Sequence, residues 1–227
     1  MNALRFTSES TARKTPNKAF KSDSLRLAFS LRSSIAKRAS HLNAALTYNG
    51  RKMELPKFKY HPDPIATGVF EKSDDICECC SKAKGYIYTS SFYTAQDVKS
   101  ICPWCIADGS AATKYNGSFS DDYPLIEEGV DLAVVVEVCE RTPGYPSWQQ
   151  EIWQVHCGTA CEFHGDAEKE DLECLAGDEL DTFLTKEMVD PEVWPKIIQH
   201  YEKGGQPSVY KFKCTECQEI VLTMDYT

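Results

Sequence analysis

The sequence predicts an α+β protein in which small β elements carry paired cysteines and a helical insert separates the last two pairs. Three observations predict this arrangement: close cysteine pairs recur along the chain, short β-branched and aromatic runs lie beside them, and a helical pattern precedes the last pair. Eight of the eleven cysteines form the pairs, which are Cys77/Cys80, Cys102/Cys105, Cys157/Cys161 and Cys214/Cys217.

The composition is that of a globular protein without a membrane-spanning segment. With 227 residues, 42% of them hydrophobic, the chain can bury one substantial core or two modest ones. Its longest apolar run, Leu132–Val136, is too short to cross a bilayer. The odd number of cysteines and their close spacing argue against an extracellular disulfide framework, so we expect a cytoplasmic protein.

The charge divides the chain at residue 52. Residues 1–52 hold 11 Lys and Arg against two acidic residues, a net charge of +9, whereas the remainder holds 14 against 32, a net charge of −18. We expect 1–52 to be a disordered basic segment, with a transit peptide or a nucleic-acid-binding tail as alternatives. The stretch Thr15–Leu46 resembles translated recombination-site repeats of integron gene cassettes, which implies read-through and a start at Met53.

Residues 53–128 are predicted to form an N-terminal zinc-binding half. Two residues separate Cys77 from Cys80 and Cys102 from Cys105, and 21 residues separate the pairs. This spacing is typical of a four-thiolate zinc site, because a tight turn directs both sulfurs of a pair at one point. Cys79 could replace a neighbour as ligand, but we favour a buried apolar role for it.

Residues 129–227 are predicted to form a C-terminal zinc-binding half. Two strands flank Cys214/Cys217 as a zinc-ribbon-like hairpin, which needs Cys157 and Cys161 as its other half-site. The 52 residues between these pairs predict a helical insert at about 175–204. Its last helix should have Asp190 as its N-cap and Pro191 in the first helical position. The apolar run in 129–141 fits a helix or a buried strand equally well.

Histidines offer an alternative ligand set at the second site. Either His156 or His164 could replace a cysteine there, and with Glu162 they could also form a catalytic zinc site with an open water position. Four cysteines leave no such open position, so we favour two structural zinc ions, one in each half.

A thiol–disulfide oxidoreductase is the alternative function. Cys102-Pro-Trp-Cys105 has the form of a redox dithiol, whose lowered thiol pKa at a helix N-terminus permits disulfide exchange. That mechanism normally has a buried strand directly before the motif. Here the preceding residues, 93–100, are polar, which disfavours redox chemistry.

Several long motifs resemble the bacterial CbrC family. They include Phe58–Gly68, Cys77–Cys80, Gly85–Tyr88, Cys102–Ala112, Arg141–Tyr145, Trp148–Glu151 and His156-Cys157. The resemblance covers 53–227 and excludes the first 52 residues. It implies a cytoplasmic protein linked to colicin tolerance, and it implies no established reaction.

The motifs together predict a zinc-stabilised binding or regulatory protein and no catalytic residues. Every strong motif is a ligand pair, and none combines a nucleophile with a base. The −18 charge of residues 53–227 disfavours nucleic acid, apart from a local patch such as Lys82 and Lys84. We therefore expect a protein partner.

Overall fold

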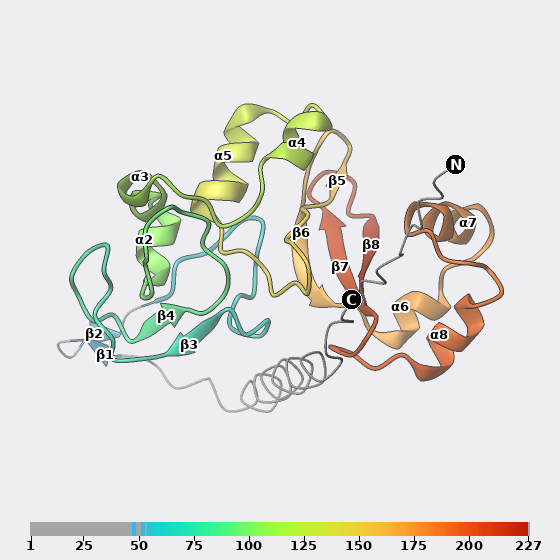
Figure 1. The fold of residues 1–227 in the computed structure, drawn as a ribbon, viewed down its shortest axis with the longest axis horizontal. Helices are drawn as coiled ribbons and strands as arrows, with labels where there is room; N and C mark the ends of the chain where they lie inside the picture. Colours follow the sequence, from blue (N-terminus) through green and yellow to red (C-terminus); the bar gives the residue numbers. More distant parts are fainter. Residues whose placement is uncertain (1–46, 49–50, 53, 227) are drawn as a thin grey trace, which may run out of the picture. The chain divides into compact units, whose positions relative to one another are not determined.

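The computed structural model describes residues 47–48, 51–52 and 54–226, in a mixed arrangement of helices and strands (Figure 1). The prediction for residues 1–52 falls almost entirely outside the described residues. The described elements, in chain order, are β1 (Thr47–Tyr48), β2 (Arg51–Lys52), β3 (Phe70–Lys72), β4 (Tyr86–Tyr88), α2 (Pro103–Ala107), α3 (Ser110–Tyr115), α4 (Tyr123–Glu127), α5 (Leu132–Arg141), β5 (Val155–His156), β6 (Thr159–Asp166), α6 (Lys169–Glu173), α7 (Gly177–Lys186), α8 (Trp194–His200), β7 (Ser208–Cys214) and β8 (Ile220–Asp225).

The first cysteine pairs are held together by a small antiparallel hairpin. Strand β3 pairs with β4, and the Tyr88 N–H of β4 donates to the Ile101 carbonyl at 2.9 Å. This bond places the residue before Cys102 beside the hairpin. Aromatic and aliphatic side chains surround the cysteines in one buried cluster, whose members include Phe58, Val69, Phe70, Tyr86, Tyr88, Ile101, Ile106 and Phe119. The local core therefore fixes where both pairs lie.

The ambiguous run in 129–141 forms helix α5. Asp131 caps it, because its Oδ1 accepts from the Ala133 N–H at 2.8 Å. One face buries Val135, Val138 and Cys139. At its other end, Arg141 donates from Nε and Nη2 to the Ala107 carbonyl, each at 3.1 Å. Helix α5 thus contacts both the first cysteine region and the second.

The second region is built on a four-stranded antiparallel sheet with the order β5-β6-β7-β8. Side chains alternate between its two faces, as a pleated sheet requires. One face carries an aromatic core in which Tyr145 stacks on Phe163 at 4.4 Å between ring centroids. The other face carries Val209 and Leu222, which pack against the insert.

The helical insert predicted for about 175–204 contains α7 and α8, and α6 precedes them (Figure 1). The last helix is predicted to have Asp190 as its N-cap and Pro191 in its first position, and this prediction is wrong by three residues. Asp190 does cap a turn, with its Oδ1 accepting from the Glu192 N–H at 2.8 Å. However, α8 begins only at Trp194, because Pro195 lacks the N–H that a helix from Pro191 would use.

No helix in the described part of the chain is long and apolar enough to cross a membrane. The described residues belong to one compact unit.

Candidate metal centres

The first candidate metal centre contains the four cysteines predicted for it. The sulfurs of Cys77, Cys80, Cys102 and Cys105 all lie within 4.8 Å of one another. The distances are 3.8 Å from Cys77 to Cys105, 3.9 Å from Cys80 to Cys102, and 3.6 Å from Cys102 to Cys105. A tetrahedral site with metal–sulfur bonds of about 2.3 Å has edges of about 3.8 Å between sulfurs. The four sulfurs therefore fit one tetrahedral metal ion.

The turn after Cys77 directs this pair inward. The Cys77 N–H donates to the Lys82 carbonyl at 3.1 Å, and the Ser81 N–H donates to the Cys77 carbonyl at 2.7 Å. Ser81 takes the left-handed conformation, with φ of 56°, which closes the turn. Cys79 lies outside the group, and its sulfur donates to Ser110 Oγ at 3.5 Å.

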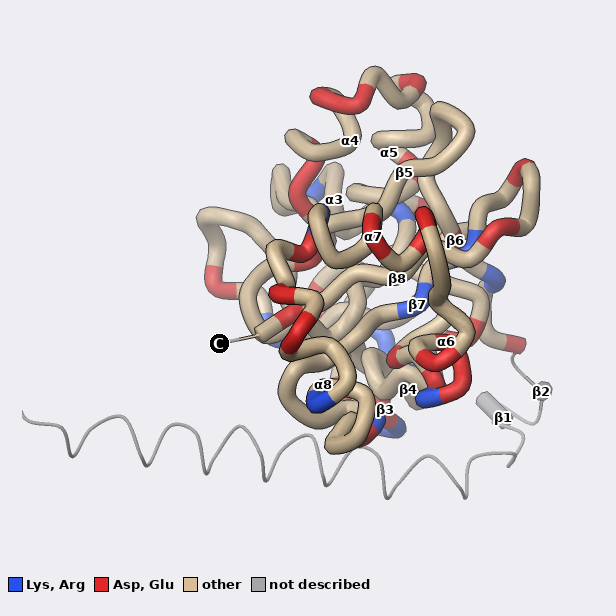
Figure 2. Tube along the Cα trace, turned by 90° about the vertical axis from the view of Figure 1, so that its right-hand side faces the viewer, with Lys and Arg blue, Asp and Glu red and all other residues tan. Residues whose placement is uncertain are grey.

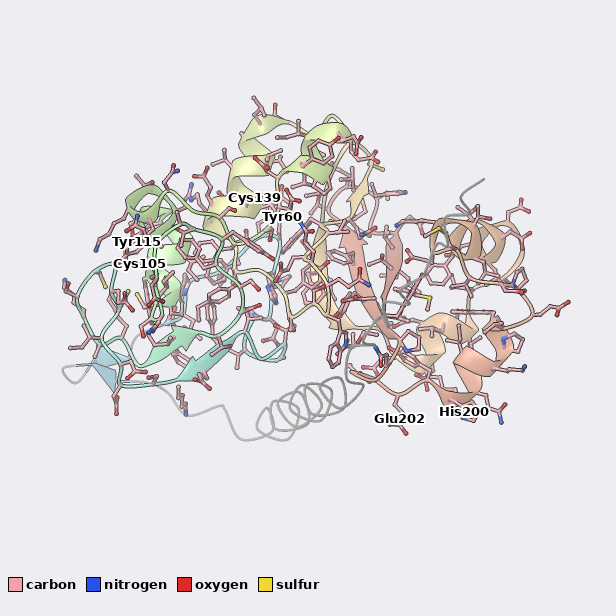
Figure 3. The ribbon with its side chains drawn as sticks, viewed as in Figure 1. Tyr60, Cys105, Tyr115, Cys139, His200 and Glu202 are labelled. Atoms are coloured by element: carbon pink, nitrogen blue, oxygen red, sulfur yellow. The ribbon has the colours of Figure 1, made fainter. Side chains whose placement is uncertain are left out.

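Three of the four cysteines at the first centre are buried, and Cys80 is half-buried. Cys77 and Cys102 are fully buried, and Cys105 is 3% exposed. Figure 3 places Cys105 among several sulfur atoms beside α2. Hydrogen bonding from the Cys102 thiol lowers the pKa of Cys77 to about 4, and the same pairing, together with burial, raises the pKa of Cys102. These shifts favour the thiolate of Cys77 over that of Cys102, and a divalent cation would favour ionisation of all four thiols.

The second candidate centre contains three of the predicted cysteines and a histidine. His156, Cys157, Cys214 and Cys217 offer ligand atoms that all lie within 4.8 Å. His156 Nδ1 lies 3.4 Å from Cys157 Sγ and 3.2 Å from Cys217 Sγ. These values are near the nitrogen–sulfur edge of about 3.5 Å for a tetrahedral ion with bonds of about 2.0 and 2.3 Å.

The predicted ligand Cys161 lies outside this group. It belongs to β6, where its backbone pairs with Cys214, and its fully buried side chain joins the aromatic core. Burial raises its pKa to about 12, which opposes the thiolate that a metal needs. The structure therefore places His156 where the sequence prediction placed Cys161. His164 and Glu162 bond to each other at 3.2 Å and also lie outside the group.

A two-residue loop brings His156 and Cys157 to the same point. His156 pairs with Thr159, so only Cys157 and Gly158 connect β5 to β6. Both loop residues have positive φ, 53° and 72°, as a type I′ hairpin turn requires. The backbone of Cys157 is in the left-handed conformation. Its side chain therefore does not point to the face opposite that of His156, as it would in a regular strand. The Cys157-Gly158 dipeptide is the sequence signal for this turn.

The last pair repeats the turn of the first. The Cys214 N–H donates to the Glu219 carbonyl at 2.8 Å, and the Gln218 N–H donates to the Cys214 carbonyl at 3.1 Å. Gln218 is left-handed, with φ of 68°. Burial alone would raise the pKa of Cys214, but backbone N–H groups of Cys217 and Glu216 outweigh it and lower this pKa to about 6. Cys157 and Cys217 are both exposed.

Fold and site together define a mixed α and β protein with two clusters of cysteine and histidine that could hold metal ions. The chain matches the uncharacterised protein family UPF0167 over residues 55–226, and it belongs to that family. A UPF0167 protein of Pseudomonas aeruginosa is 47% identical over 175 residues, which are 76% of this chain and 98% of that protein.

A UPF0167 protein of Mycobacterium bovis is 36% identical over 179 residues, which are 76% of this chain and 94% of that protein. No solved structure matches the chain. Membership of UPF0167 is compatible with the motif resemblance to the CbrC family.

Proposed function

We propose that this chain is a non-enzymatic binding or regulatory protein whose fold is stabilised by two structural zinc ions. The zinc-ribbon-like hairpins would hold one ion between Cys77, Cys80, Cys102 and Cys105, and the other between His156, Cys157, Cys214 and Cys217. The observation that carries this proposal is the set of sulfur–sulfur distances near 3.8 Å at the first centre. Zinc suits both donor sets, because it prefers tetrahedral shells of thiolate and imidazole.

A structural role is favoured because neither shell leaves an open coordination position. A catalytic zinc keeps one position for water, whereas each group here supplies four ligand atoms. The close thiol pairs also suit a reducing compartment, which supports a cytoplasmic location. A link to colicin tolerance rests on the motif resemblance alone.

The oxidoreductase alternative is disfavoured by burial. Cys102 does lie at the N-terminus of α2, as a redox dithiol would. However, an exchange-active thiol must be reached by its partner disulfide, and Cys102 is fully buried against Cys77.

Alkylation of the purified full chain under native conditions tests this proposal. We expect two zinc ions per chain, and protection of Cys102 and Cys105 from iodoacetamide until a chelator is added. Cys174 is a built-in control, because it is exposed, lies outside both groups and should react at once. A folded, metal-free chain with a Cys102–Cys105 disulfide would overturn the proposal in favour of the oxidoreductase.

A further inference from the structure

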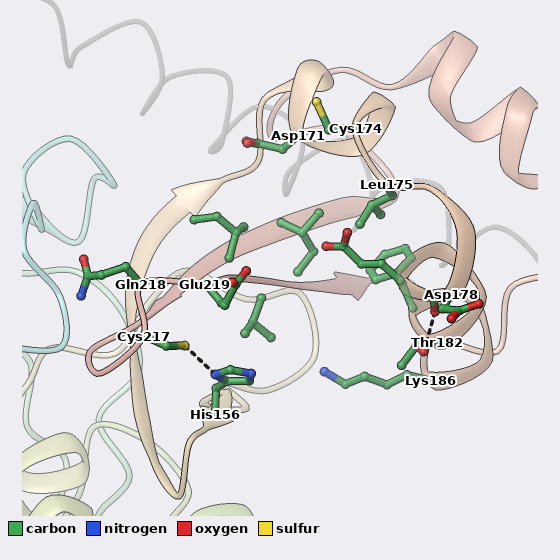
Figure 4. Close-up of a pocket in the computed structure, with 15 residues that line it drawn as sticks. His156, Asp171, Cys174, Leu175, Asp178, Thr182, Lys186, Cys217, Gln218 and Glu219 are labelled. Carbon is green, nitrogen blue, oxygen red and sulfur yellow. Dashed lines mark hydrogen bonds between the residues drawn. The ribbon is translucent and has the colours of Figure 1, made fainter.

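A groove of about 740 Å³ lies between strand β8 and helix α7, on the face of the sheet that the insert covers (Figure 4). Its lining is partly apolar, with Leu175, Phe183 and Leu222 from the insert core and Ile220, which is 37% exposed. His156 and Cys217 of the second centre also line it, so the groove and that centre adjoin each other.

Strand β8 is an edge of its sheet, and part of its backbone faces away from β7. The Met224 N–H donates to Glu187 Oε2 at 2.9 Å, so the backbone of Met224 points outward. Strand residues alternate in direction, so the N–H and C=O groups of Ile220 and Leu222 point outward too. Within the described residues, no hydrogen bond joins these four groups to any partner. Such an edge can accept an added strand.

The groove is negatively charged. Four carboxylates line it against one lysine, and they belong to Asp171, Asp178, Glu179 and Glu219. Lys211 bonds to Asp171 at 2.7 Å, and the lining Lys186 donates to Gln154 Oε1 at 2.6 Å. Figure 2 shows acidic positions gathered along α6 and α7. A basic segment would be attracted here, whereas a second copy of a region with a net charge of −18 would be repelled.

We propose that the β8 edge is the docking site for an extended, basic peptide segment of a partner protein. The segment pairs its backbone with Ile220 and Leu222. Every second side chain of the segment faces the groove, where apolar ones contact Leu175 and Phe183 and basic ones reach Asp178 and Glu179. This inference rests on the proposed function, because the Cys214/Cys217 turn closes the β7–β8 hairpin and its metal holds the edge in place.

Fluorescence anisotropy of the zinc-loaded full chain tests the inference with a labelled eight-residue peptide of repeating Lys-Lys-Val-Val, which presents both Lys and Val on each face of an extended strand. We expect saturable binding that weakens with salt. A matched peptide of repeating Lys-Lys-Pro-Pro has the same charge but half the backbone N–H groups, and it should bind roughly tenfold more weakly. Ile220→Pro removes one outward N–H and keeps the β7 ladder, and it should also weaken binding roughly tenfold.

Neutralising the acidic residues tests the charge contribution separately. The double variant Asp178→Asn/Glu179→Gln should bind the Lys-Val peptide roughly fivefold more weakly at low salt. The matched control is Glu127→Gln/Glu128→Gln, which changes an adjacent, exposed acidic pair at the C-terminal end of α4 and should leave affinity unchanged.

Equal binding of the two peptides, or full affinity of Ile220→Pro, would overturn strand addition. Self-association that Ile220→Pro abolishes, without peptide binding, would assign the edge to a second copy. Zinc content is measured in every sample to separate the two proposals. Full zinc without peptide binding overturns the docking site alone, whereas peptide binding by a folded, zinc-free chain contradicts the structural role of zinc and leaves the docking site standing.

Discussion

The two candidate metal centres use the same turn in different surroundings. Each has a Cys-x-x-Cys turn closed by a left-handed residue, Ser81 in the first and Gln218 in the second, with the same pair of backbone hydrogen bonds. In the first centre, the turn lies beside the Cys102/Cys105 pair in a buried aromatic cluster. In the second centre, the turn lies beside His156 and Cys157 at an exposed loop.

This difference shows which part of a metal centre depends only on residues that are neighbours in the sequence. The turn depends on a few consecutive residues, so its spacing alone identifies it. The partner ligands depend on strand register, which exchanges the two faces of a strand when it shifts by one residue. A metal bound at the first centre would stabilise the surrounding core and be stabilised by it, because that centre is largely buried. The second centre is more exposed and adjoins a groove.

Removing one ligand of the buried centre should have the largest effect. Cys102→Ser should release one metal ion and unfold the region around β3 and β4, because structural zinc supplies on the order of 10 kcal/mol of folding free energy. Metal analysis and circular dichroism would measure both losses. The matched control is Cys79→Ser, which lies outside the group and should keep its metal. A folded Cys102→Ser chain with its full metal content would show that Cys102 is not a ligand of a structural metal ion.

Acid should weaken the contact between the two regions. His61 is fully buried, contacts Phe163 at 5.1 Å between ring centroids, and donates from Nδ1 to the Pro143 carbonyl at 2.9 Å. Burial lowers its pKa to about 4, despite the opposing Pro143 bond and Asp63 charge. In the unfolded chain, His61 has its ordinary pKa of 6.5. The stability gained by burying the neutral imidazole is therefore complete above pH 6.5 and is lost as the pH falls toward 4.

The expected loss between these pH values is about 3 kcal/mol in the free energy of unfolding. Urea unfolding at several pH values would measure it. His61→Gln, compared with the unchanged chain at each pH, separates this contribution from metal release. If the free energy of unfolding falls equally with pH in both proteins, His61 does not cause the loss of stability in acid.

The choice of ligands at the second centre can be tested with two substitutions. Cys161→Ala should keep both metal ions and destabilise the core by about 1 to 2 kcal/mol, because it removes one buried sulfur. His156→Ala should lose one metal ion. The opposite result, metal loss in Cys161→Ala alone, would restore the all-cysteine site predicted from sequence.

The exposed centre should lose its metal first. We expect the second centre to release zinc to a chelator roughly tenfold faster than the first, because a chelator reaches an exposed centre without opening a core. Colorimetric release kinetics would show two phases, and Cys214→Ser should remove the fast one. A single phase for both ions would contradict the contrast in burial.

Much of the fold follows from local signals, whereas the ligand set of the second centre does not. The β7–β8 hairpin and the helical insert were predicted because their turn residues and periodicity are local. Helix α5 could not be distinguished from a strand, because its apolar run is continuous and only the Asp131 cap and its packing decide. The sequence does not reveal that Cys161 lies outside the second group. The direction of its side chain depends on pairing with Cys214, 53 residues away in the chain.

X-ray absorption at the zinc edge of the full chain measures the ligands of both proposed zinc sites. Two zinc ions with seven sulfur ligands and one nitrogen ligand predict, on average, about 3.5 sulfurs at about 2.3 Å and about 0.5 nitrogen at about 2.0 Å per ion. A spectrum with four sulfurs per ion would contradict the role of His156. A spectrum with oxygen ligands, or a folded chain without zinc, would contradict the closed structural sites themselves.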